Sequence, residues 1–372
     1  MRIAVSAEAI TSRPSGARVR LTSLYPLLAK RMFYAEFTFF VDKTADLEAH
    51  FSECNNVSFV YVGLGYKSRL FRYIMVSYAV LKHSIRSRFD VIESLSLPLV
   101  VNFRGKSLLT LHDLRGLSEG HFLKRLGYRV VFWLSARLSS ATIAVSDSTR
   151  ADIQDALPGA AVIVIGNTIS ETVNSPIKCS GLNQHITKYD LSEKFIVAVG
   201  HFEPRKNYEN LLYAVHYLRE REFSPQVVII GNDSGTLARL LETRSNLALQ
   251  DNVKILQGLS DYEIRLCYRL ASGFIFPSRY EGFGIPILEA MNANLPMALS
   301  NLKVFREVAG EAAIYFDPLN PVEIAESIVK LDSIPKQSET PLPGYRQILA
   351  RYDAHALSKL LADCYENMAS TK

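Results

Sequence analysis

The stretch that decides the fold runs from Gly273 to Ala290 and has the sequence GFIFPSRYEGFGIPILEA. Its first four residues are apolar and predict a short buried parallel strand. A helix is predicted from Pro286 to Ala293, since proline is favoured at the first position of a helix. A strand, a glycine turn and a helix N-terminus together form an anion site, because unpaired N–H groups and the positive end of the helix dipole meet there.

Two carboxylates, Glu281 and Glu289, flank the Gly-Phe-Gly turn of this stretch. One acid on a loop and one in the following helix suit a ligand that carries both phosphates and hydroxyls, such as a nucleotide sugar. A Gly-x-Gly turn before a helix is common, however, and is weak evidence by itself. The alternative for Glu289 is an ordinary first-turn acid favoured by the helix dipole.

Apolar strands alternate with helical patterns along the whole chain, which predicts an α/β protein with two doubly wound parallel sheets. Twelve strands are expected: Ile3–Ser6, Phe37–Val41, Val57–Val62, Val91–Glu93, Leu108–Leu111, Thr142–Val145, Phe195–Gly200, Gln226–Gly231, Val253–Gln257, Gly273–Phe276, Pro296–Leu299 and Ala313–Phe316. A polar stretch of low periodicity, about residues 169–193, separates the two series. In such folds the ligand is expected in the cleft between the halves, outside the carboxyl ends of the strands.

These patterns predict two Rossmann-like domains in a chain of 372 residues. We expect an N-terminal domain over 1–175, a linker over 176–193, a C-terminal domain over 194–350 and a terminal helix over 351–372 that packs back toward the N-terminal domain. The first residues predict a strand rather than a signal peptide. The most apolar window, near Val130–Val145, contains Arg137 and several serines and is too polar for a membrane span.

Polar residues follow several of the predicted strands, at the edge where parallel strands converge. They are Arg18 (with Gly16 before it), His112, Asp113, Ser146 and Ser148 in the first half, and Arg205, Lys206 and Asn207 in the second. Each alone has a structural alternative: Ser146 as a helix cap, His112 as a satisfied core histidine, and Arg205 with Lys206 as surface bases. Their joint position favours one ligand site.

Positive charge is concentrated in the first half of the chain. Residues 1–180 hold 22 Lys and Arg against 14 Asp and Glu, whereas the whole chain has a net charge of +5. No acid occurs from Cys54 to Phe89, and Lys67, Arg69 and Arg72 alternate there with apolar residues. Residues 65–90 therefore predict a basic amphipathic helix that contacts an anionic membrane, with a solvated helix face as the alternative. No nucleic-acid-binding motif accompanies these bases.

Beyond these patterns, the chain resembles the retaining, nucleotide-sugar-dependent glycosyltransferases of family 4, which have the two-Rossmann GT-B fold. The resemblance is densest from Phe195 to Asp317. Val199–Asn207 is similar to the family's diphosphate-binding segment, and Pro277–Met291 is similar to its paired-glutamate motif. In the first half, Gly16-Ala17-Arg18, Thr110–Leu114 and Ala144–Arg150 resemble the family's donor loop, histidine segment and serine-rich strand end.

The resemblance implies roles for particular residues. Arg205 and Lys206 would neutralise the leaving diphosphate, Glu281 would bind the hydroxyls of the donor sugar, Glu289 would bind the ribose, and His112 would lie beside the donor sugar. Further donor-binding residues would be Gly16, Gly282, Phe283, Gly284, Ile285, Ser146 and Asn207. No Asp-x-Asp pair occurs in the sequence, so we expect neither a metal nor a cofactor, the nucleotide sugar being a substrate.

One departure from the family pattern lies after the second glutamate. The family usually has a Cys-Gly-x-Pro turn there, and this chain has Asn292-Ala293-Asn294-Leu295-Pro296. Asparagine tolerates a left-handed backbone better than most residues, so Asn294 is expected to replace the glycine.

The expected function is therefore metal-independent sugar transfer, with retention, to a lipid-linked or polysaccharide acceptor, as in surface-polysaccharide synthesis. GDP-mannose is the favoured donor, with a dTDP- or UDP-sugar second. We expect a cytoplasmic protein with peripheral contact at the inner face of the membrane and no nucleic-acid partner. The alternatives are a nucleotide-sugar 2-epimerase on a related fold and a non-catalytic nucleotide-sugar-binding subunit.

Overall fold

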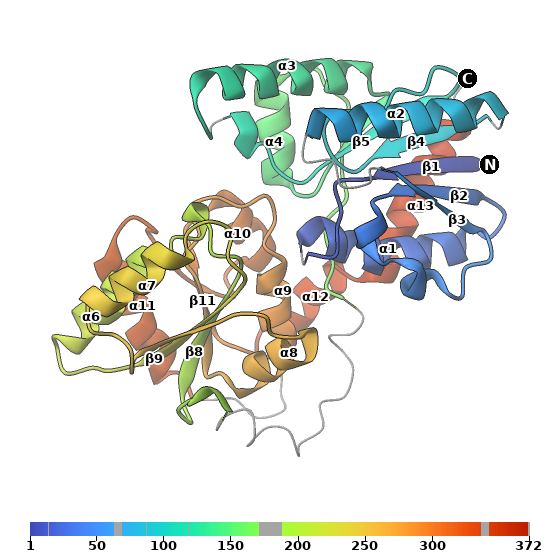
Figure 1. Cartoon of the computed structure of the whole chain (residues 1–372). Helices are drawn as coiled ribbons and strands as arrows, with labels where there is room; N and C mark the ends of the chain where they lie inside the picture. The colour runs from blue at the N-terminus through green and yellow to red at the C-terminus, as the bar shows by residue number, and fades with distance from the viewer. Residues whose placement is uncertain are drawn as a thin grey trace. The chain divides into compact units, whose positions relative to one another are not determined.

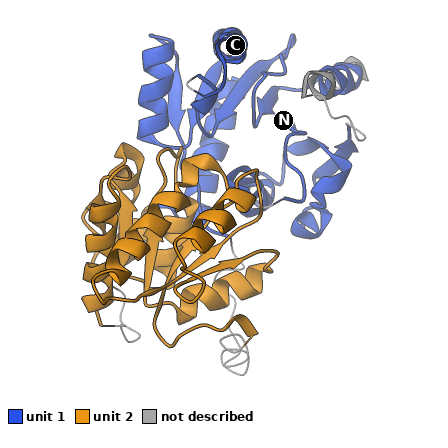
Figure 2. Ribbon diagram, turned by 60° about the vertical axis from the view of Figure 1, so that its left-hand side comes forward, with its two compact units in different colours: residues 1–170, 352–372 blue, residues 171–351 orange. Residues whose placement is uncertain are grey.

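The structure is a computed structural model of the whole chain (Figure 1). It describes residues 1–13, 15–62, 69–86, 88–117, 119–170, 188–335 and 342–370. The chain divides into two compact units, coloured separately in Figure 2: unit 1 comprises residues 1–170 and 352–372, and unit 2 comprises residues 171–351. No described helix is long and apolar enough to cross a membrane.

Unit 1 is built on a parallel sheet of seven strands in the order β3-β2-β1-β4-β5-β6-β7. Its strands are β1 (Arg2–Ala7), β2 (Glu36–Val41), β3 (Val57–Tyr61), β4 (Val91–Ser94), β5 (Lys106–Leu111), β6 (Ala141–Ala144) and β7 (Val162–Val164). Its helices are α1 (Gly16–Arg31), α2 (Arg69–Arg86), α3 (Phe122–Leu138), α4 (Asp147–Ala156) and α13 (Ala354–Ser370), and short 3-10 turns cover Lys43–Ala45, Glu48–Phe51 and Arg115–Leu117. The sequence missed β7, an edge strand of three residues that is too short to show alternation.

Alternation along the strands assigns the helices of unit 1 to the two faces of its sheet. Ile3 and Val5 of β1 pack in one cluster with α1 and α13, whereas Ala4, between them, packs with α2. Leu109 and Leu111 of β5 pack against α3 and α4. Helices α1 and α13 therefore cover one face, and α2, α3 and α4 cover the other, as right-handed crossovers in opposite directions from β1 require (Figure 1).

A buried carboxylate ties the C-terminal helix to this sheet. Glu93 of β4 is fully buried and accepts hydrogen bonds from the hydroxyls of Tyr25, at 2.8 Å, Thr110 and Tyr365. Those three hydroxyls come from α1, β5 and α13, so one side chain links elements 272 residues apart in sequence. Every donor is a neutral hydroxyl. The cluster therefore holds the three elements together and leaves no charged group exposed to a ligand.

Unit 2 repeats the plan with a parallel sheet of six strands in the order β10-β9-β8-β11-β12-β13. Its strands are β8 (Phe195–Val199), β9 (Gln226–Ile230), β10 (Val253–Leu256), β11 (Gly273–Phe276), β12 (Met297–Ser300) and β13 (Ile314–Phe316). Its helices are α6 (Tyr208–Arg219), α7 (Leu237–Asn246), α8 (Asp261–Leu270), α9 (Ile285–Asn292), α10 (Lys303–Ala309), α11 (Pro321–Ser333) and α12 (Tyr345–Arg351), with a 3-10 turn at Pro204–Lys206. The predicted fold class, two doubly wound parallel sheets, is confirmed.

Candidate functional site

The decisive stretch forms a strand, a turn and a helix, as its sequence predicts. Strand β11 covers Gly273–Phe276, and α9 begins at Ile285, one residue before the predicted start. The residue before the helix, Gly284, has a φ of 103°. A side chain on Gly284 would be strained there and would lie 3.0 Å from Ile287 and from Phe305, so glycine is required. The turn therefore brings the chain tightly from the end of β11 into the N-terminus of α9.

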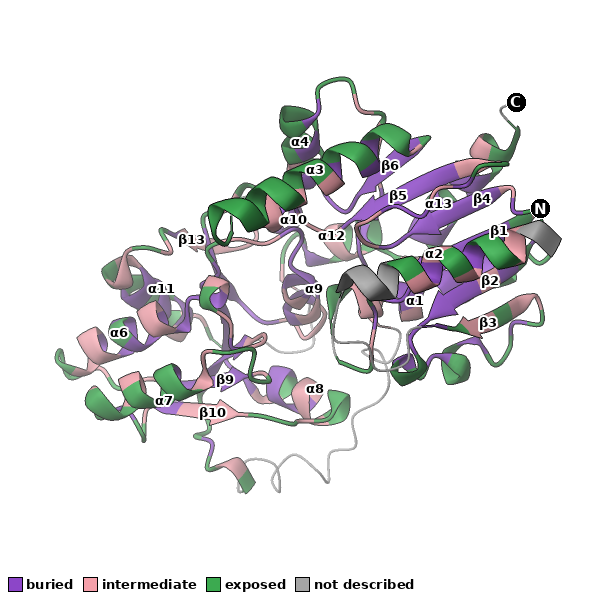
Figure 3. Cartoon of the chain, turned by 45° about the horizontal axis from the view of Figure 1, so that its top comes forward, coloured by how far each residue is buried: buried purple, intermediate pink, exposed green. Residues whose placement is uncertain are grey.

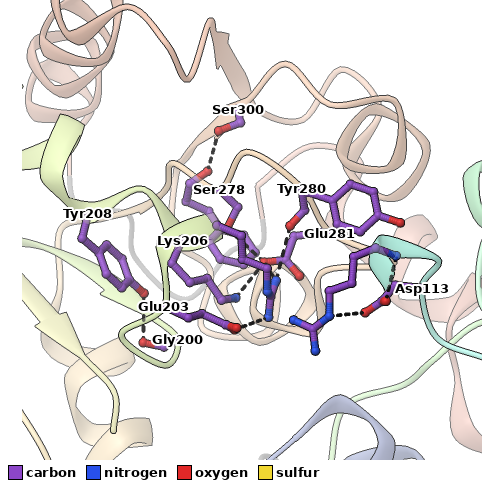
Figure 4. A network of polar contacts seen from close by, with 12 residues as sticks. Asp113, Gly200, Glu203, Lys206, Tyr208, Ser278, Tyr280, Glu281 and Ser300 are labelled. Carbon is purple, nitrogen blue, oxygen red and sulfur yellow. Dashed lines mark hydrogen bonds and ion pairs between the residues drawn. The ribbon is translucent and has the colours of Figure 1, made fainter. Parts of the chain in front are cut away.

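Glu281, on this turn, is the centre of a charged cluster (Figure 4). Its Oε1 lies 2.5 Å from Nη1 of Arg205 and 2.7 Å from Nζ of Lys206. Both cations come from the 3-10 turn after β8, where Lys206 is 75 residues before Glu281 and Arg205 is its neighbour. Ser278 donates a further hydrogen bond to the same oxygen at 3.0 Å. The two strand ends are thus joined through one carboxylate oxygen.

A second acid completes this cluster. Glu203 accepts a hydrogen bond from Nη2 of Arg205 at 2.5 Å, and Nη1 of Arg205 also donates to the carbonyl of Tyr280 at 3.3 Å. The guanidinium is consequently held by two carboxylates, which fixes its plane and its position. Two cations and two carboxylates make the cluster close to neutral in the absence of a ligand.

The electrostatics of the cluster favour ionised groups. Burial alone would raise the pKa of Glu281, but the Lys206 and Arg205 cations outweigh burial and lower that pKa to about 2. Burial opposes the charge of Arg205, yet its pairing with Glu281 and Glu203 raises its pKa. For Lys206 burial is the larger effect and lowers the pKa, although Glu281 opposes it. A charged carboxylate and an always-protonated guanidinium are therefore present at neutral pH.

Lys206 is the most enclosed cation of the cluster. Its side chain is 7% exposed, and its ammonium lies 4.5 Å from the centre of the Phe276 ring, a cation–π contact. Gly200, at the end of β8, passes so close that an added Cβ would lie 2.9 Å from Lys206 Cε. The ammonium is thereby held in place by packing as well as by its ion pair, and it needs little reordering to meet an anion.

Glu289 lies in α9 in a different environment. It is half-buried, and its Oε2 accepts a hydrogen bond from the hydroxyl of Tyr268, in α8, at 2.9 Å. Burial raises the pKa of Glu289, and the Tyr268 hydrogen bond opposes this shift. The two glutamates predicted as a pair thus differ in kind, because Glu281 is held by cations and Glu289 by a neutral hydroxyl.

The other site residues predicted in unit 2 build the frame of the cluster. Asn207 directly precedes α6 and has a φ of 60°, and its amide nitrogen donates to the carbonyls of Pro277 and Pro318 at 3.0 and 2.7 Å. Its amide oxygen accepts a hydrogen bond from Arg279 at 2.8 Å. The turn residues Gly282, Phe283, Gly284 and Ile285 are all buried. Asn294, where glycine is usual in the family, has the predicted left-handed backbone, with a φ of 57°.

The sites predicted in unit 1 lie at the carboxyl edge of its own sheet. Gly16 is the first residue of α1, after β1, and His112 directly follows β5. Burial, assisted by Arg20, lowers the pKa of His112 to about 3, so the imidazole is neutral at physiological pH. Its Nε2 is buried and has no hydrogen-bond partner among the described residues. Ser146 caps α4 by accepting a hydrogen bond from the backbone N–H of Thr149 at 3.0 Å. This is the helix-cap role given above as the structural alternative to a ligand contact.

Five polar residues of unit 2 that the sequence did not single out take part in the contacts around these residues. They are Glu203, Ser278, Arg279, Tyr208 and Tyr268. Ser278 and Glu203 are next to quoted motif residues and could have been found by their position. Tyr268 belongs to the amphipathic pattern of α8, and nothing in that pattern marks it as a partner of Glu289. No group of three or more metal-binding side chains occurs in the described part of the chain.

Comparison with known proteins agrees with this arrangement. The family model described as "Glycosyl transferases group 1" matches residues 183–341, which include the Glu281 cluster and Glu289. Over these residues, the chain belongs to the glycosyl transferases group 1 family. The protein is thus a glycosyltransferase with the GT-B fold, as its resemblance implied.

Two relatives and one solved structure are similar to this chain. The O-antigen chain mannosyltransferase RfbU of Salmonella typhimurium is 24% identical over 72% of this chain and 70% of its own length. The GDP-mannose:cellobiosyl-diphosphopolyprenol alpha-mannosyltransferase of Komagataeibacter xylinus is 26% identical over 66% of this chain and 61% of its own. The crystal structure of Anabaena Alr3699/HepE with UDP and glucose is 18% identical, with a TM-score of 0.77 over 99% of this chain and 100% of that one. At that identity the structural match shows the fold alone.

Proposed function

We propose that this glycosyltransferase transfers a hexose, with retention of configuration and without a metal, from a nucleotide sugar to a lipid-linked or polysaccharide acceptor. GDP-mannose is the favoured donor. The observation on which the proposal rests is the cluster of Arg205, Lys206 and Glu281 at the turn that leads into α9. It puts two cations and a carboxylate beside a helix N-terminus, the combination that a diphosphate joined to a sugar requires.

The proposed roles follow from the chemistry of each group. A nucleoside diphosphate gains negative charge as it leaves, and Arg205 can bind it through two N–H groups while Lys206 acts as a point charge. Glu281 would then exchange part of its contact with these cations for the hydroxyls of the donor sugar. Glu289 would accept hydrogen bonds from the ribose, and the neutral His112 would lie beside the sugar. These two cations can supply the positive charge that a metal supplies in other transferases.

Retention in this proposal does not involve a covalent sugar–enzyme intermediate. The acceptor would attack the face of the sugar from which the diphosphate departs, and the leaving phosphate would take the acceptor's proton. Glu281 is suited to binding rather than nucleophilic attack, because both cations and Ser278 already contact its Oε1. The product anomer, measured by NMR with a defined acceptor, tests whether the configuration is retained.

The names of the relatives support the donor and the acceptor. The Salmonella relative is named for O-antigen chain mannosyl transfer, and the Komagataeibacter relative for GDP-mannose and a diphosphopolyprenol-linked acceptor. A UDP-sugar is the second candidate donor, since the Anabaena structure of the same fold was also solved with UDP-glucose. We place the reaction at the inner face of the cytoplasmic membrane. The predicted membrane contact through 65–90 includes Lys67, which is outside the described residues, and Arg69 and Arg72, whose side chains are not described.

A panel of nucleotide sugars tests the proposal directly. The true donor, held at 100 times its dissociation constant, should stabilise the protein by about 2.7 kcal/mol in a thermal-shift assay. It should also release nucleoside diphosphate slowly through hydrolysis, and faster with acceptor. Stabilisation without release would favour the non-catalytic binding subunit, and a 2-epimer of the donor as product would favour the epimerase. A panel in which no nucleotide sugar binds would overturn the proposal.

A further inference from the structure

Helix α3 of unit 1 is inverted relative to an ordinary surface helix: its apolar side faces outward. Most of its large apolar residues are exposed, and Phe122 and Leu123 are 74% and 71% exposed (Figure 3). Phe122, Leu126, Val130 and Trp133 follow one another at helical spacing and form one row. A neighbouring row contains Leu123, Leu134 and Leu138. Only Phe132, Ser135 and Ala136 of the helix are buried.

Cations flank this apolar face, and α3 itself carries no acid. Lys124, Arg125, Arg129 and Arg137 are all exposed, and no Asp or Glu occurs from Gly120 to Ser146. None of the four forms an ion pair within the described part of the chain. Arg137 instead lies over the ring of Trp133, 4.9 Å from its centre. Aromatic and aliphatic side chains edged by Lys and Arg are the composition of a helix that lies in the interface of a bilayer.

The neighbouring elements extend the same surface. On α2, which covers the same face of the sheet, Ile74, Tyr78 and Leu81 are 50–61% exposed and spaced for one side of the helix. Beside α3 a groove of about 410 Å³ runs toward the end of α4. Apart from Arg129, it is lined by Leu126, Val130, Phe132, Trp133, Leu134 and Ala156. An apolar groove of this kind can take part of an acyl chain once the helix lies at the lipid surface.

We propose that the outer face of α3, together with Ile74, Tyr78 and Leu81 of α2, docks the protein onto an anionic lipid bilayer. Charge complementarity favours an anionic bilayer over a second copy of the chain as the partner of this face. Two copies joined through α3 would bring the four cations of one copy against the four cations of the other. The three α2 residues lie within the segment 65–90 predicted from sequence, whereas α3 lies wholly outside it, so the surface extends beyond that prediction. The inference rests on the proposed function, in which the acceptor is linked to a lipid. Its test uses neither donor nor acceptor, so lipid docking and the proposed sugar transfer can fail independently of each other.

Trp133 makes the test direct, because it is the one tryptophan of the chain and is 43% exposed. The full chain is mixed with phosphatidylcholine vesicles that contain or lack phosphatidylglycerol. With the anionic vesicles we expect the tryptophan emission to shift to the blue and to be quenched by brominated acyl chains. Neutral vesicles should give little response, and high salt should weaken the response to anionic ones because it screens the bases. An unchanged emission with anionic vesicles at low salt would overturn the inference.

Matched variants separate this face from exposed apolar surface in general. Phe122→Ser with Leu138→Ser removes side chains that are 74% and 57% exposed, and should lower the vesicle partition coefficient about tenfold or more. The control, Phe33→Ser with Leu360→Ser, removes side chains that are 79% and 50% exposed beside α1 and on α13, and should bind like wild type. Equal losses in the two double variants would count against α3.

A charge variant tests the electrostatic part. Lys124→Gln with Arg129→Gln should lower the partition coefficient for anionic vesicles by about 25-fold, or about fivefold per cation. The same variant should partition into neutral vesicles as wild type does. Light scattering of the free protein provides the last check: a stable dimer that the Phe122→Ser, Leu138→Ser variant dissociates would show that a second copy covers the face, and would overturn lipid docking.

Discussion

Each unit contains a glutamate at the centre of a polar cluster, and the two clusters differ in their donors. In unit 1, Glu93 is fully buried and accepts hydrogen bonds from three neutral hydroxyls that belong to three different elements. In unit 2, the side chain of Glu281 is 11% exposed and contacts two cations that come from a single turn. The first arrangement satisfies every donor within the fold. The second holds charges that an incoming anion can share.

This difference separates a structural polar cluster from a candidate site in a chain with no bound ligand. A carboxylate that accepts hydrogen bonds from buried hydroxyls contributes mainly to stability, since its removal leaves several buried donors without an acceptor. A cluster of carboxylates and cations is close to neutral in the absence of a ligand, and a diphosphate can replace a carboxylate as the partner of the cations. The comparison therefore predicts that substitutions in unit 2 change ligand binding and turnover, whereas substitutions around Glu93 change stability.

The largest effect is expected on turnover in unit 2. Arg205→Ala and Lys206→Ala should each cost roughly 2–4 kcal/mol of transition-state stabilisation, or about 30- to 1000-fold in kcat/KM, since each removes a cation from the leaving diphosphate. Sugar transfer or donor hydrolysis under saturating acceptor measures the loss. Lys330→Ala, which removes an exposed cation at the end of α11, is the control and should turn over normally. Near-normal rates in both site variants would remove Arg205 and Lys206 from the mechanism.

A chelator sharpens the same prediction. If the two cations supply the positive charge at the diphosphate, EDTA should leave turnover of the wild type almost unchanged. Strong inhibition, restored by a divalent ion, would show that a metal takes part. This result would leave the fold and the donor class intact while changing the electrostatic account of the reaction.

The next effect is expected on the stability of unit 1. Glu93→Ala leaves the hydroxyls of Tyr25, Thr110 and Tyr365 without their acceptor and should lower the free energy of unfolding by about 3 kcal/mol. Trp133 lies in unit 1, so its fluorescence during denaturant unfolding reports on this unit. Tyr365→Phe removes one hydroxyl and should cost about 1 kcal/mol, which keeps the prediction testable if Glu93→Ala fails to fold.

The control for this prediction is Glu326→Ala, an exposed carboxylate on α11. It should leave the unfolding of unit 1 unchanged. Nucleotide binding by folded Tyr365→Phe should also match wild type. A variant of Glu93 that loses donor affinity while keeping its stability would reverse the assignments made to the two clusters.

A third prediction separates the two glutamates of unit 2. Glu289→Ala should weaken the binding of GDP by about 1.5–3 kcal/mol, or roughly 10- to 150-fold, because the ribose is present with or without the sugar. Glu281→Ala should leave GDP binding nearly unchanged and lower turnover, because its proposed partner is the sugar. Calorimetry with GDP on both variants measures this difference. Equal losses of affinity would mean that the two roles are divided wrongly.

Much of the fold could be predicted from sequence because strands buried on both faces appear as continuous apolar runs. The predicted bounds of strand β11 match the observed ones, and the predicted bounds of the other strands of unit 2 differ from the observed ones by no more than two residues at either end. The edge strand β7 was missed because three residues give no period. The outward apolar face of α3 could not be foreseen, since periodicity shows that a helix has two faces but not which of them the sheet covers.

The residues of the candidate site could be named from sequence, but the contacts among them could not. Glu281 was expected to meet a sugar, and Arg205 and Lys206 a diphosphate. Their ion pairs with one another join positions 75 or 76 apart, and only the folded sheet brings the ends of β8 and β11 together. Similarly, nothing in the sequence connects Tyr268 with Glu289, because the hydroxyl belongs to a residue whose ring packs in the core.

The smallest predicted effect concerns this last pair and its dependence on pH. Glu281, with a pKa of about 2, stays ionised at all working pH values, whereas burial raises the pKa of Glu289. The folded state therefore holds the proton of Glu289 more tightly than the unfolded chain does, and its contribution to stability is lost as the pH rises through the raised pKa. As the pH falls, Glu289 is protonated before Glu281, and GDP affinity should fall because a neutral acid is the weaker acceptor for ribose hydroxyls.

Tyr268→Phe removes the hydroxyl that lowers the pKa of Glu289, so the loss of GDP affinity should begin at a higher pH than in wild type. At neutral pH the variant should bind GDP about fivefold more weakly, corresponding to one hydrogen bond of about 1 kcal/mol. Calorimetric titrations from about pH 4 to pH 8 measure both effects. Tyr262→Phe, an exposed tyrosine on the same helix, is the control and should follow the wild-type profile. Coincident profiles for Tyr268→Phe and wild type would show that the ionisation of Glu289 does not control nucleotide binding, and the ribose would then have to be assigned to another acceptor.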